Sequence, residues 1–243
     1  LEADDPISHK GEFWQFDDMR LQLKSYQQPR LPLALPTTGG LESLDLAARH
    51  DMELWTPCGL NRPGGGVFTS LWSDFEKACG REGKTANRNS WHLVSSFYLA
   101  ESREKAWADV REGLMRETGY FLSIGFKSLY QAYPDQPISE ITAVSAAERR
   151  DWVIGTPDDA IAWIENKIEQ NGQFGGVMLT THEWAGSEKL RHSLELFARY
   201  VIPHFNSGRY NLKNEAEVLA EQFAEHGEVL FDAEYQKSNL TNK

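Results

Sequence analysis

The sequence has few cysteines, few basic residues and no long apolar run, and each shortage excludes a class of protein. Two cysteines in 243 residues, Cys58 and Cys79, are too few for a disulfide framework, so we expect a reducing, cytoplasmic location. No apolar stretch is long enough to span a bilayer. Lysine and arginine number 25 against 36 aspartates and glutamates, and the net charge of −11 argues against nucleic-acid and membrane partners.

The beginning of the sequence lacks an initiating methionine and a signal peptide. The chain starts at Leu1 and its first ten residues are mostly polar; from this start we expect a fragment or a processed chain. Its length suits one large domain or two small ones. Hydrophobic residues make up 40% and charged residues 25%, which is typical of a globular protein and justifies looking for a packed core.

The stretch from 31 to 50 has the pattern of a strand, a tight turn and a helix. An apolar run at 31–35 predicts the strand, and the segment Pro36–Gly40 predicts the turn. Apolar residues at three- and four-residue spacing then predict one face of a helix: Leu41, Leu44, Ala47 and Ala48.

This turn has the composition of an anion site. Gly39 and Gly40 let the backbone approach a ligand, and the first helical N–H groups have no partner inside the helix. Three hydroxyl groups could add donors, those of Thr37, Thr38 and Ser43. The turn matches neither a Walker loop nor G-x-G-x-x-G, and the acidic Glu42 argues against a phosphate. A phosphate site and an ordinary strand-to-helix turn therefore both remain open.

Further strands and helices alternate along the chain. Three more strands are predicted at 52–57, 91–99 and 176–181. A loop is predicted at 58–67, and helices are predicted at 68–80, at 102–118, from Thr156 to about 171 and at 188–200, the last closed by Pro203. The apolar residues expected to face inward on these helices are, in order, Leu71, Trp72, Phe75 and Ala78; Ala106, Val110 and Leu114; Ile161, Ile164 and Ile168; and Leu190, Leu194, Phe197 and Val201. Thr156 is a favourable N-cap, with Pro157 at the first helical position and Asp159 as the capping-box acid. Residues 11–26 suggest a hairpin or flap with aromatic anchors, and 119–150 an insertion.

The alternation predicts an α/β fold with a parallel sheet. Small polar residues at the strand ends are typical of the C-terminal face of a (β/α) barrel: Thr37, Thr38, Thr56, Thr180 and Thr181. The sequence shows only four such strands, whereas a closed barrel of this kind needs eight. Four strands would leave two open edges and an uncovered apolar face.

Several segments carry a family resemblance. They are the strand, turn and helix of 31–50, the helix cap Ile154–Asp159 and the long stretch Trp184–Phe205, with smaller contributions from Gly11–Trp14, Leu21–Leu23 and Tyr98–Ala106. Together they resemble the bacterial luciferase-like, flavin-dependent monooxygenases, most closely the limonene monooxygenase-type branch. The resemblance covers about residues 11–205.

The resemblance implies a luciferase-like TIM (β/α)8 barrel, of which this chain holds strands five to eight in residues 1–205. Residues 206–243 then form a polar extension with a helix near 214–225. Family members bind reduced FMN at the C-terminal face, use O2 to oxidise an apolar organic substrate, and usually depend on a separate flavin reductase. By resemblance we expect these partners, and a homodimer for the full-length protein.

The family's phosphate loop falls on Thr37–Ser43, which strengthens the anion-site interpretation for Gly39, Gly40 and Ser43. The flavin ring would meet the next strand near Trp55, Thr56 and Pro57, although Trp55 could equally belong to the core. The resemblance thus implies a cofactor site made of Thr37, Thr38, Gly39, Gly40, Ser43, Trp55 and Thr56.

The sequence departs from the family's pattern at the residues that carry out catalysis. The family's catalytic histidine, its phosphate-binding arginine and its strained peptide beneath the flavin come from the N-terminal half, and none has a counterpart here. None of the seven histidines stands in a nucleophile or metal pattern, so the catalytic residue stays unknown and no metal is expected. His182 follows a strand and could reach a pocket or be structural; His50, His192 and His204 fit structural or solvated roles.

Three functions remain open. The first is the C-terminal half of an FMN-dependent monooxygenase, which should need its other half for activity. The second is a non-catalytic flavin-binding relative or partner subunit, which an in-frame upstream coding sequence for the missing half would argue against. The third is an unrelated α/β domain that uses the 36–43 turn for another phosphate, which preferential binding of a sugar phosphate would support.

Overall fold

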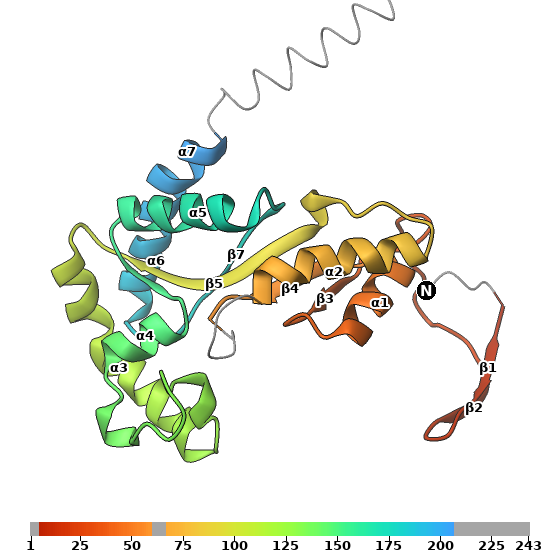
Figure 1. The fold of residues 1–243 in the computed structure, drawn as a ribbon, viewed down its shortest axis with the longest axis horizontal. Helices are drawn as coiled ribbons and strands as arrows, with labels where there is room; N and C mark the ends of the chain where they lie inside the picture. Colours follow the sequence, from red (N-terminus) through yellow and green to blue (C-terminus); the bar gives the residue numbers. More distant parts are fainter. Residues whose placement is uncertain (1–4, 60–66, 207–243) are drawn as a thin grey trace, which may run out of the picture. The chain divides into compact units, whose positions relative to one another are not determined.

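The computed structural model describes residues 5–59 and 67–206 (Figure 1). Most of the predicted 58–67 loop and the predicted 214–225 helix lie outside these ranges. The chain forms two compact units, each assembled from three stretches of sequence. The first unit contains 1–97, 114–153 and 165–182, and the second contains 98–113, 154–164 and 183–243.

The central sheet is parallel and has five strands. They are β3 (Ala34–Pro36), β4 (Glu53–Pro57), β5 (Trp91–Leu99), β6 (Val153–Gly155) and β7 (Gly176–Thr180). The order is β3-β4-β5-β6, and β7 also pairs with β5. The predicted count of four strands was wrong by one, because β6 is only three residues long. The sequence analysis read that segment as the approach to a helix cap.

A short hairpin precedes the sheet (Figure 1). Strands β1 (Ile7–Lys10) and β2 (Gln15–Met19) pair antiparallel. The hairpin therefore begins before the predicted 11–26 region. The expected aromatic anchors were wrong: Phe13 is 82% exposed and Trp14 78% exposed, because both lie in the turn between the strands.

Two helices pack together beside β3 and β4 (Figure 1). Helix α1 (Leu41–Arg49) buries Leu44, Ala47 and Ala48, as predicted. Leu41 is 62% exposed instead of buried, because it stands at the open first turn. Helix α2 (Val67–Arg81) buries its predicted stripe, which comprises Leu71, Trp72, Phe75 and Ala78.

The longest helix and the segment after it differ from the prediction in extent. Helix α3 (Arg103–Ser123) continues five residues past the predicted end at Thr118, and its predicted stripe of Ala106, Val110 and Leu114 is fully buried. Two 3-10 turns, Lys127–Leu129 and Ile138–Glu140, precede α4 (Ala143–Arg149). Tyr130, between them, is buried, so the predicted insertion carries part of the core.

Helix α5 (Pro157–Asn171) starts with the predicted capping box. The Thr156 N–H donates to Asp159 Oδ2 at 2.8 Å, and the Asp159 N–H donates to Thr156 Oγ1 at 3.4 Å. Arg103 pairs with the same carboxylate, and these hydrogen bonds lower the pKa of Asp159 to about 2. The expected buried stripe is only partly confirmed, because Ile164 is buried whereas Ile161 and Ile168 are half-buried.

The last described helix does not stop at Pro203. Helix α6 (Ser187–Leu196) passes through a π-helical turn, Phe197–Val201, into α7 (Ile202–Asn206). Pro203, which has no N–H to donate, follows directly after this turn, where the Ile202 N–H bonds Phe197 O in the wider π-helical pattern. Leu194, predicted to face inward, is 38% exposed.

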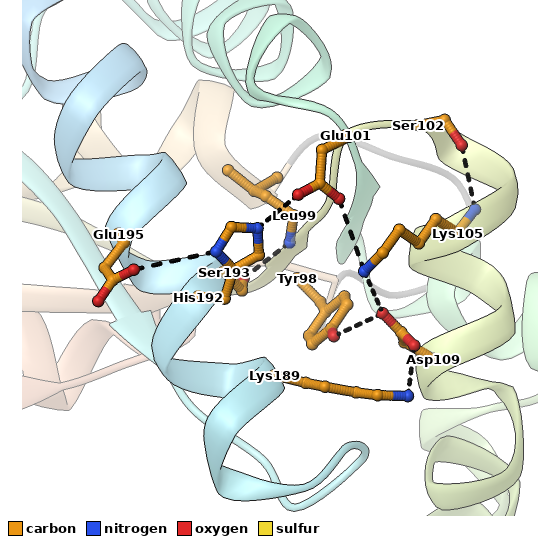
Figure 2. Close-up of polar contacts among 10 residues, drawn as sticks. All are labelled: Tyr98, Leu99, Glu101, Ser102, Lys105, Asp109, Lys189, His192, Ser193 and Glu195. Atoms are coloured by element: carbon orange, nitrogen blue, oxygen red, sulfur yellow. Dashed lines mark hydrogen bonds and ion pairs between the residues drawn. The ribbon is translucent and has the colours of Figure 1, made fainter.

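The second unit is held by a polar cluster (Figure 2). Asp109 of α3 accepts hydrogen bonds from Tyr98 at 3.1 Å, Lys105 at 3.2 Å and Lys189 of α6 at 2.5 Å. His192 of α6 bonds Glu101 at 2.6 Å, and the Ser193 hydroxyl accepts the Leu99 N–H at 2.8 Å. These bonds tie the end of β5 and the start of α3 to α6.

Candidate functional site

The carboxyl ends of the parallel strands meet at one edge of the sheet. Pro36 pairs with Trp55 in β3 and β4, and Pro57 pairs with Val94 in β4 and β5. Ser96 pairs with Thr180 at the end of β7. In parallel α/β folds the functional residues lie at this edge, on the loops that follow the strands. The predicted cofactor residues and several residues missed by sequence analysis are found here.

The predicted phosphate loop forms a tight turn after β3. Gly39 has φ of 95°, and a Cβ there would lie 3.3 Å from Leu71, so this position requires glycine. The Gly39 N–H donates to Thr37 Oγ1 at 3.1 Å. Thr37 is buried, so its hydroxyl stabilises the turn and does not face the solvent.

The start of α1 is left open to an anion. Its N-cap is Gly40, which has no side chain to bond the first helical N–H groups. A Cβ at Gly40 would lie 3.8 Å from the half-buried Ser43 hydroxyl, over that first turn. Thr38 is exposed beside it, and so is Glu42, the one group of unfavourable charge in the first turn. The free N–H groups and the two hydroxyls suit a phosphate.

The two predicted ring-contact residues of β4 lie on opposite faces of the sheet, because successive side chains alternate along a strand. Thr56 is 1% exposed, and its Oγ1 accepts the Trp91 Nε1–H at 2.8 Å. That face is covered by α2, whose Trp72 stacks on Trp91 with ring centroids 5.4 Å apart. Trp55 points to the other face and is half-buried, so only one of the two side chains reaches the uncovered side.

The uncovered face continues across the neighbouring strands. In β4 and the first four residues of β5 the side chains on the helix-covered face are buried, whereas those on the other face are half-buried: Glu53, Trp55, Pro57, His92 and Val94. Met178 of β7 pairs with Val94 and is half-buried as well. Within the described residues, this part of the sheet therefore has one packed face and one half-buried, largely apolar face.

Four side chains form a hydrogen-bonded chain at the carboxyl edge. Thr180 Oγ1 lies 2.6 Å from Ser96 Oγ, and Ser96 Oγ lies 2.8 Å from His182 Nε2. His182 Nδ1 lies 3.0 Å from Glu117 Oε2, on α3. Thr180 is exposed, Ser96 is buried, and the side chains of His182 and Glu117 are 23% and 21% exposed. The four side chains thus connect an exposed hydroxyl, through a buried one, to a half-buried histidine and carboxylate.

Aromatic rings and an arginine surround this hydrogen-bonded chain. The Trp152 ring lies 5.4 Å from the His182 ring, and the Arg150 guanidinium lies 5.3 Å from Trp152 and 5.8 Å from Tyr130. Arg150 Nε and Nη1 are buried and have no hydrogen-bond partner within the described ranges. Burial lowers the pKa of Arg150 and raises the pKa of Tyr130. The environment is therefore dry and electropositive beside Glu117.

Two of the four hydrogen-bonded residues, Thr180 and His182, could be noted in the sequence, because both lie at the end of a predicted strand. His182 was noted because it follows a strand, but both interpretations of it were left open. Its partners could not be recognised, since Glu117 lies 65 residues away and Ser96 86 residues away in sequence. The structural or solvated roles expected of three other histidines agree with the structure. His192 bonds Glu101, and His50 and His204 are exposed.

In the described part of the chain, no three histidine, cysteine, aspartate or glutamate side chains are grouped to hold a metal ion. None of the helices in that part is long and apolar enough to cross a membrane.

Comparisons with known proteins identify relatives at the level of sequence. No protein-family model matches the chain. The 4-hydroxyprotoasukamycin monooxygenase of Streptomyces nodosus subsp. asukaensis is 28% identical over 210 residues, which are 85% of this chain and 55% of that protein. Limonene 1,2-monooxygenase of Rhodococcus erythropolis is 29% identical over 208 residues, 85% of this chain and 51% of that protein. The chain spans about half the length of these relatives.

A solved structure shows the same fold. The oxygenating constituent of 3,6-diketocamphane monooxygenase of Pseudomonas putida, a type II Baeyer-Villiger monooxygenase in complex with FMN, has a TM-score of 0.58 at 17% identity. The match covers 82% of this chain and 58% of that chain. By sequence and by fold, the chain resembles the luciferase-like, flavin-dependent monooxygenases, as its own motifs predict.

Proposed function

We propose that this chain is the C-terminal half of an FMN-dependent monooxygenase that oxidises an apolar organic substrate. Residues 1–205 would supply half of a (β/α)8 barrel, and residues 206–243 an extension to it. The chain's span of about half of each relative supports this division. A separate reductase would supply the reduced flavin, and the full-length protein would form a homodimer.

The one-sided sheet is the observation that carries this proposal. A barrel buries the inner faces of all its strands, so half a barrel must leave its inner face uncovered. Here the outer face of β4 and β5 is packed under helices, and the inner face is half-buried. The additional strand, β6, does not close the sheet into a barrel. Strand β7 pairs with residues 92–96 of β5, whereas β6 lies beyond that stretch, where the Ala100 N–H donates to Gly155 O at 2.8 Å.

The turn after β3 fits the phosphate of FMN. The uncapped N–H groups after Gly40, with the hydroxyls of Thr38 and Ser43, would hold it. Trp55, on the uncovered face, would lie against the ring system. Thr37 and Thr56 would support the site from the core, because their hydroxyls are already used by Gly39 and Trp91. When bound, reduced FMN would supply the electrons with which O2 oxidises the substrate.

Titration with FMN and riboflavin tests the cofactor site directly. Riboflavin lacks the phosphate, so the turn predicts that FMN binds at least about tenfold more tightly, which corresponds to about 1.4 kcal/mol. Flavin absorption and fluorescence would be followed on the full chain and on a chain extended with the N-terminal half of a homologous monooxygenase. We expect binding by the extended chain and weak or no binding by this chain alone.

A matched pair of variants locates the phosphate. Gly40→Ala keeps an allowed φ of −64°, but its Cβ would stand over the first turn of α1, so FMN binding should weaken while riboflavin binding is unchanged. Gly80→Ala, at an open position in α2, should change neither. If neither chain binds FMN, the cofactor assignment and the monooxygenase proposal both fall. If FMN and riboflavin bind equally, the phosphate turn is wrong.

Turnover tests the chemistry. The extended chain would be supplied with reduced FMN, O2 and limonene, the compound in the name of one relative, or a cyclic ketone. Oxygenated product from the extended chain supports the monooxygenase. Flavin binding without any product supports a non-catalytic flavin-binding subunit instead.

A further inference from the structure

The hydrogen-bonded chain at the end of β7 has a defined direction. Glu117 is a carboxylate and can only accept, so the proton between it and His182 belongs to Nδ1. In neutral imidazole the other nitrogen is then an acceptor, and Nε2 must receive the Ser96 hydroxyl proton. The single Ser96 hydroxyl proton is used in the hydrogen bond to His182, so Ser96 accepts the hydrogen bond that Thr180 donates.

A proton added to His182 reverses this direction. Nε2–H then donates to Ser96, Ser96 donates to Thr180, and the Thr180 proton points away from the chain. The exposed end of the chain therefore accepts a hydrogen bond when His182 is neutral and donates one when it is charged.

We propose that Thr180 is the ligand-contacting end of a proton-transfer chain, Thr180–Ser96–His182–Glu117, that serves a hydroxyl or carbonyl oxygen of an apolar ligand. A ligand hydroxyl gives its proton to Thr180 Oγ1, the Thr180 proton passes to Ser96, and the Ser96 proton passes to His182 Nε2. The ligand oxygen is left negative and His182 positive; the reverse sequence protonates a ligand oxygen. The assignment of this role to catalysis rests on the proposed function.

Thr180, and not His182, contacts the ligand in this arrangement. Both nitrogens of His182 are occupied, by Ser96 and by Glu117, so the ring has no free position for a ligand. Ser96 is 1% exposed and cannot be reached. Thr180 is the exposed member and keeps hydrogen-bonding capacity on its hydroxyl. Thr180 is thus the catalytic residue, because it contacts the ligand. Ser96 passes the proton on to His182, and Glu117 positions the His182 ring.

The surroundings define the class of ligand. Strand register places Pro57, Val94 and Met178 one level below Ser96 and Thr180 on the same uncovered face. These three side chains are apolar and half-buried. A molecule seated there would contact an apolar floor and a single line of hydroxyl groups. The fit is therefore to an alicyclic or aliphatic compound with one hydroxyl or carbonyl group, and not to a sugar or a polyanion.

Histidine NMR on the full 243-residue chain tests the proposal without flavin. We expect the ring spectrum of His182, assigned by its loss in His182→Gln, to show the proton on Nδ1. Cyclohexanol, as the probe, should shift the Nε2 resonance, whereas cyclohexane, which lacks the oxygen, should not. Thr180→Val keeps the shape but removes the hydroxyl and should abolish the shift, and Thr180→Ser should restore it. Thr181→Val, the same change one residue later, should behave as wild type.

The outcomes are separate from those of the flavin proposal. If cyclohexanol still shifts the His182 Nε2 resonance in Thr180→Val, or does not shift it in the wild type, the proposed proton-transfer role of Thr180 is refuted. In the extended protein with reduced FMN and a cyclic ketone, Thr180→Val should lower kcat by about 100-fold with little change in KM, as expected for lost acid-base catalysis. Thr180→Ser should recover most of that loss. Unchanged kcat in Thr180→Val would refute the catalytic role, whereas absence of flavin binding would leave the NMR result to decide.

Discussion

Removing the Thr56 hydroxyl separates a core role from a cofactor role. Trp91 is 0% exposed, and its Nε1–H donates to Thr56 Oγ1 at 2.8 Å inside the packed face. The substitution Thr56→Val keeps the volume and the β-branched shape but removes the acceptor. The indole N–H would then lose this buried hydrogen bond, and water cannot reach it to replace the lost acceptor.

The expected cost follows from that unsatisfied donor. A buried donor that loses its partner destabilises a protein by about 1–3 kcal/mol. For a chain of this size, each kcal/mol lowers Tm by roughly 2–4 °C, so Tm should fall by about 2–12 °C. Urea unfolding followed by tryptophan fluorescence, with the midpoint and slope fitted separately, would measure the change in the free energy of unfolding.

Thr38→Val provides the control, because it makes the same chemical change at an exposed residue of the phosphate turn. It should alter stability by less than about 0.5 kcal/mol. Flavin binding by the extended chain should respond in the opposite order, weakening in Thr38→Val and not in Thr56→Val. Loss of flavin affinity in Thr56→Val without loss of stability would refute our placement of Thr56 in the core.

Two further predictions concern stability. Gly113→Ala should destabilise the chain by several kcal/mol, since its Cβ would lie 2.1 Å from the Trp184 carbonyl oxygen. Gly119→Ala, in the open part of the same helix, should stabilise the chain by about 0.5–1 kcal/mol. Equal urea midpoints for the two variants would contradict this prediction. The pKa of Asp159 is lowered to about 2 by Arg103 and the helix cap, so its contribution is full above pH 4 and is lost as pH falls toward 2. An acid titration of unfolding free energy should show that loss in wild type and lack it in Asp159→Asn; identical acid profiles would contradict it.

The elements predicted best are those whose signals are local. Strand β5 was predicted with its observed bounds, Trp91–Leu99, because apolar and aromatic side chains predominate over a stretch of strand length. The start of α5 was also predicted correctly, since Thr156 and Asp159 satisfy each other three residues apart. Strand β6 was missed because three residues carry too little periodicity to be seen.

The candidate site was predictable only in its local part. The turn around Gly39 could be recognised because its residues are contiguous in sequence. The two faces of β4 could not be assigned, because the face that holds Thr56 is set by the packing of Trp91 and Trp72 from distant elements. The partners of His182 come from β5, β7 and α3, so only the folded chain brings them together.

The two candidate sites lie on different strands of one edge, and their separation bears on how they could work together. The phosphate turn follows β3, and Thr180 ends β7, three strands along in the order β3-β4-β5-β7. Strands are spaced by about 4.8 Å, so these strand ends lie about 14 Å apart along the sheet. A single small substrate cannot contact both. A cofactor held by its phosphate at β3, with its ring near Trp55 of β4, would leave the edge at β5 and β7 for a second molecule. Two ligands side by side, one anchored by phosphate and one by a hydroxyl chain, is the arrangement that an oxygen-transferring enzyme requires.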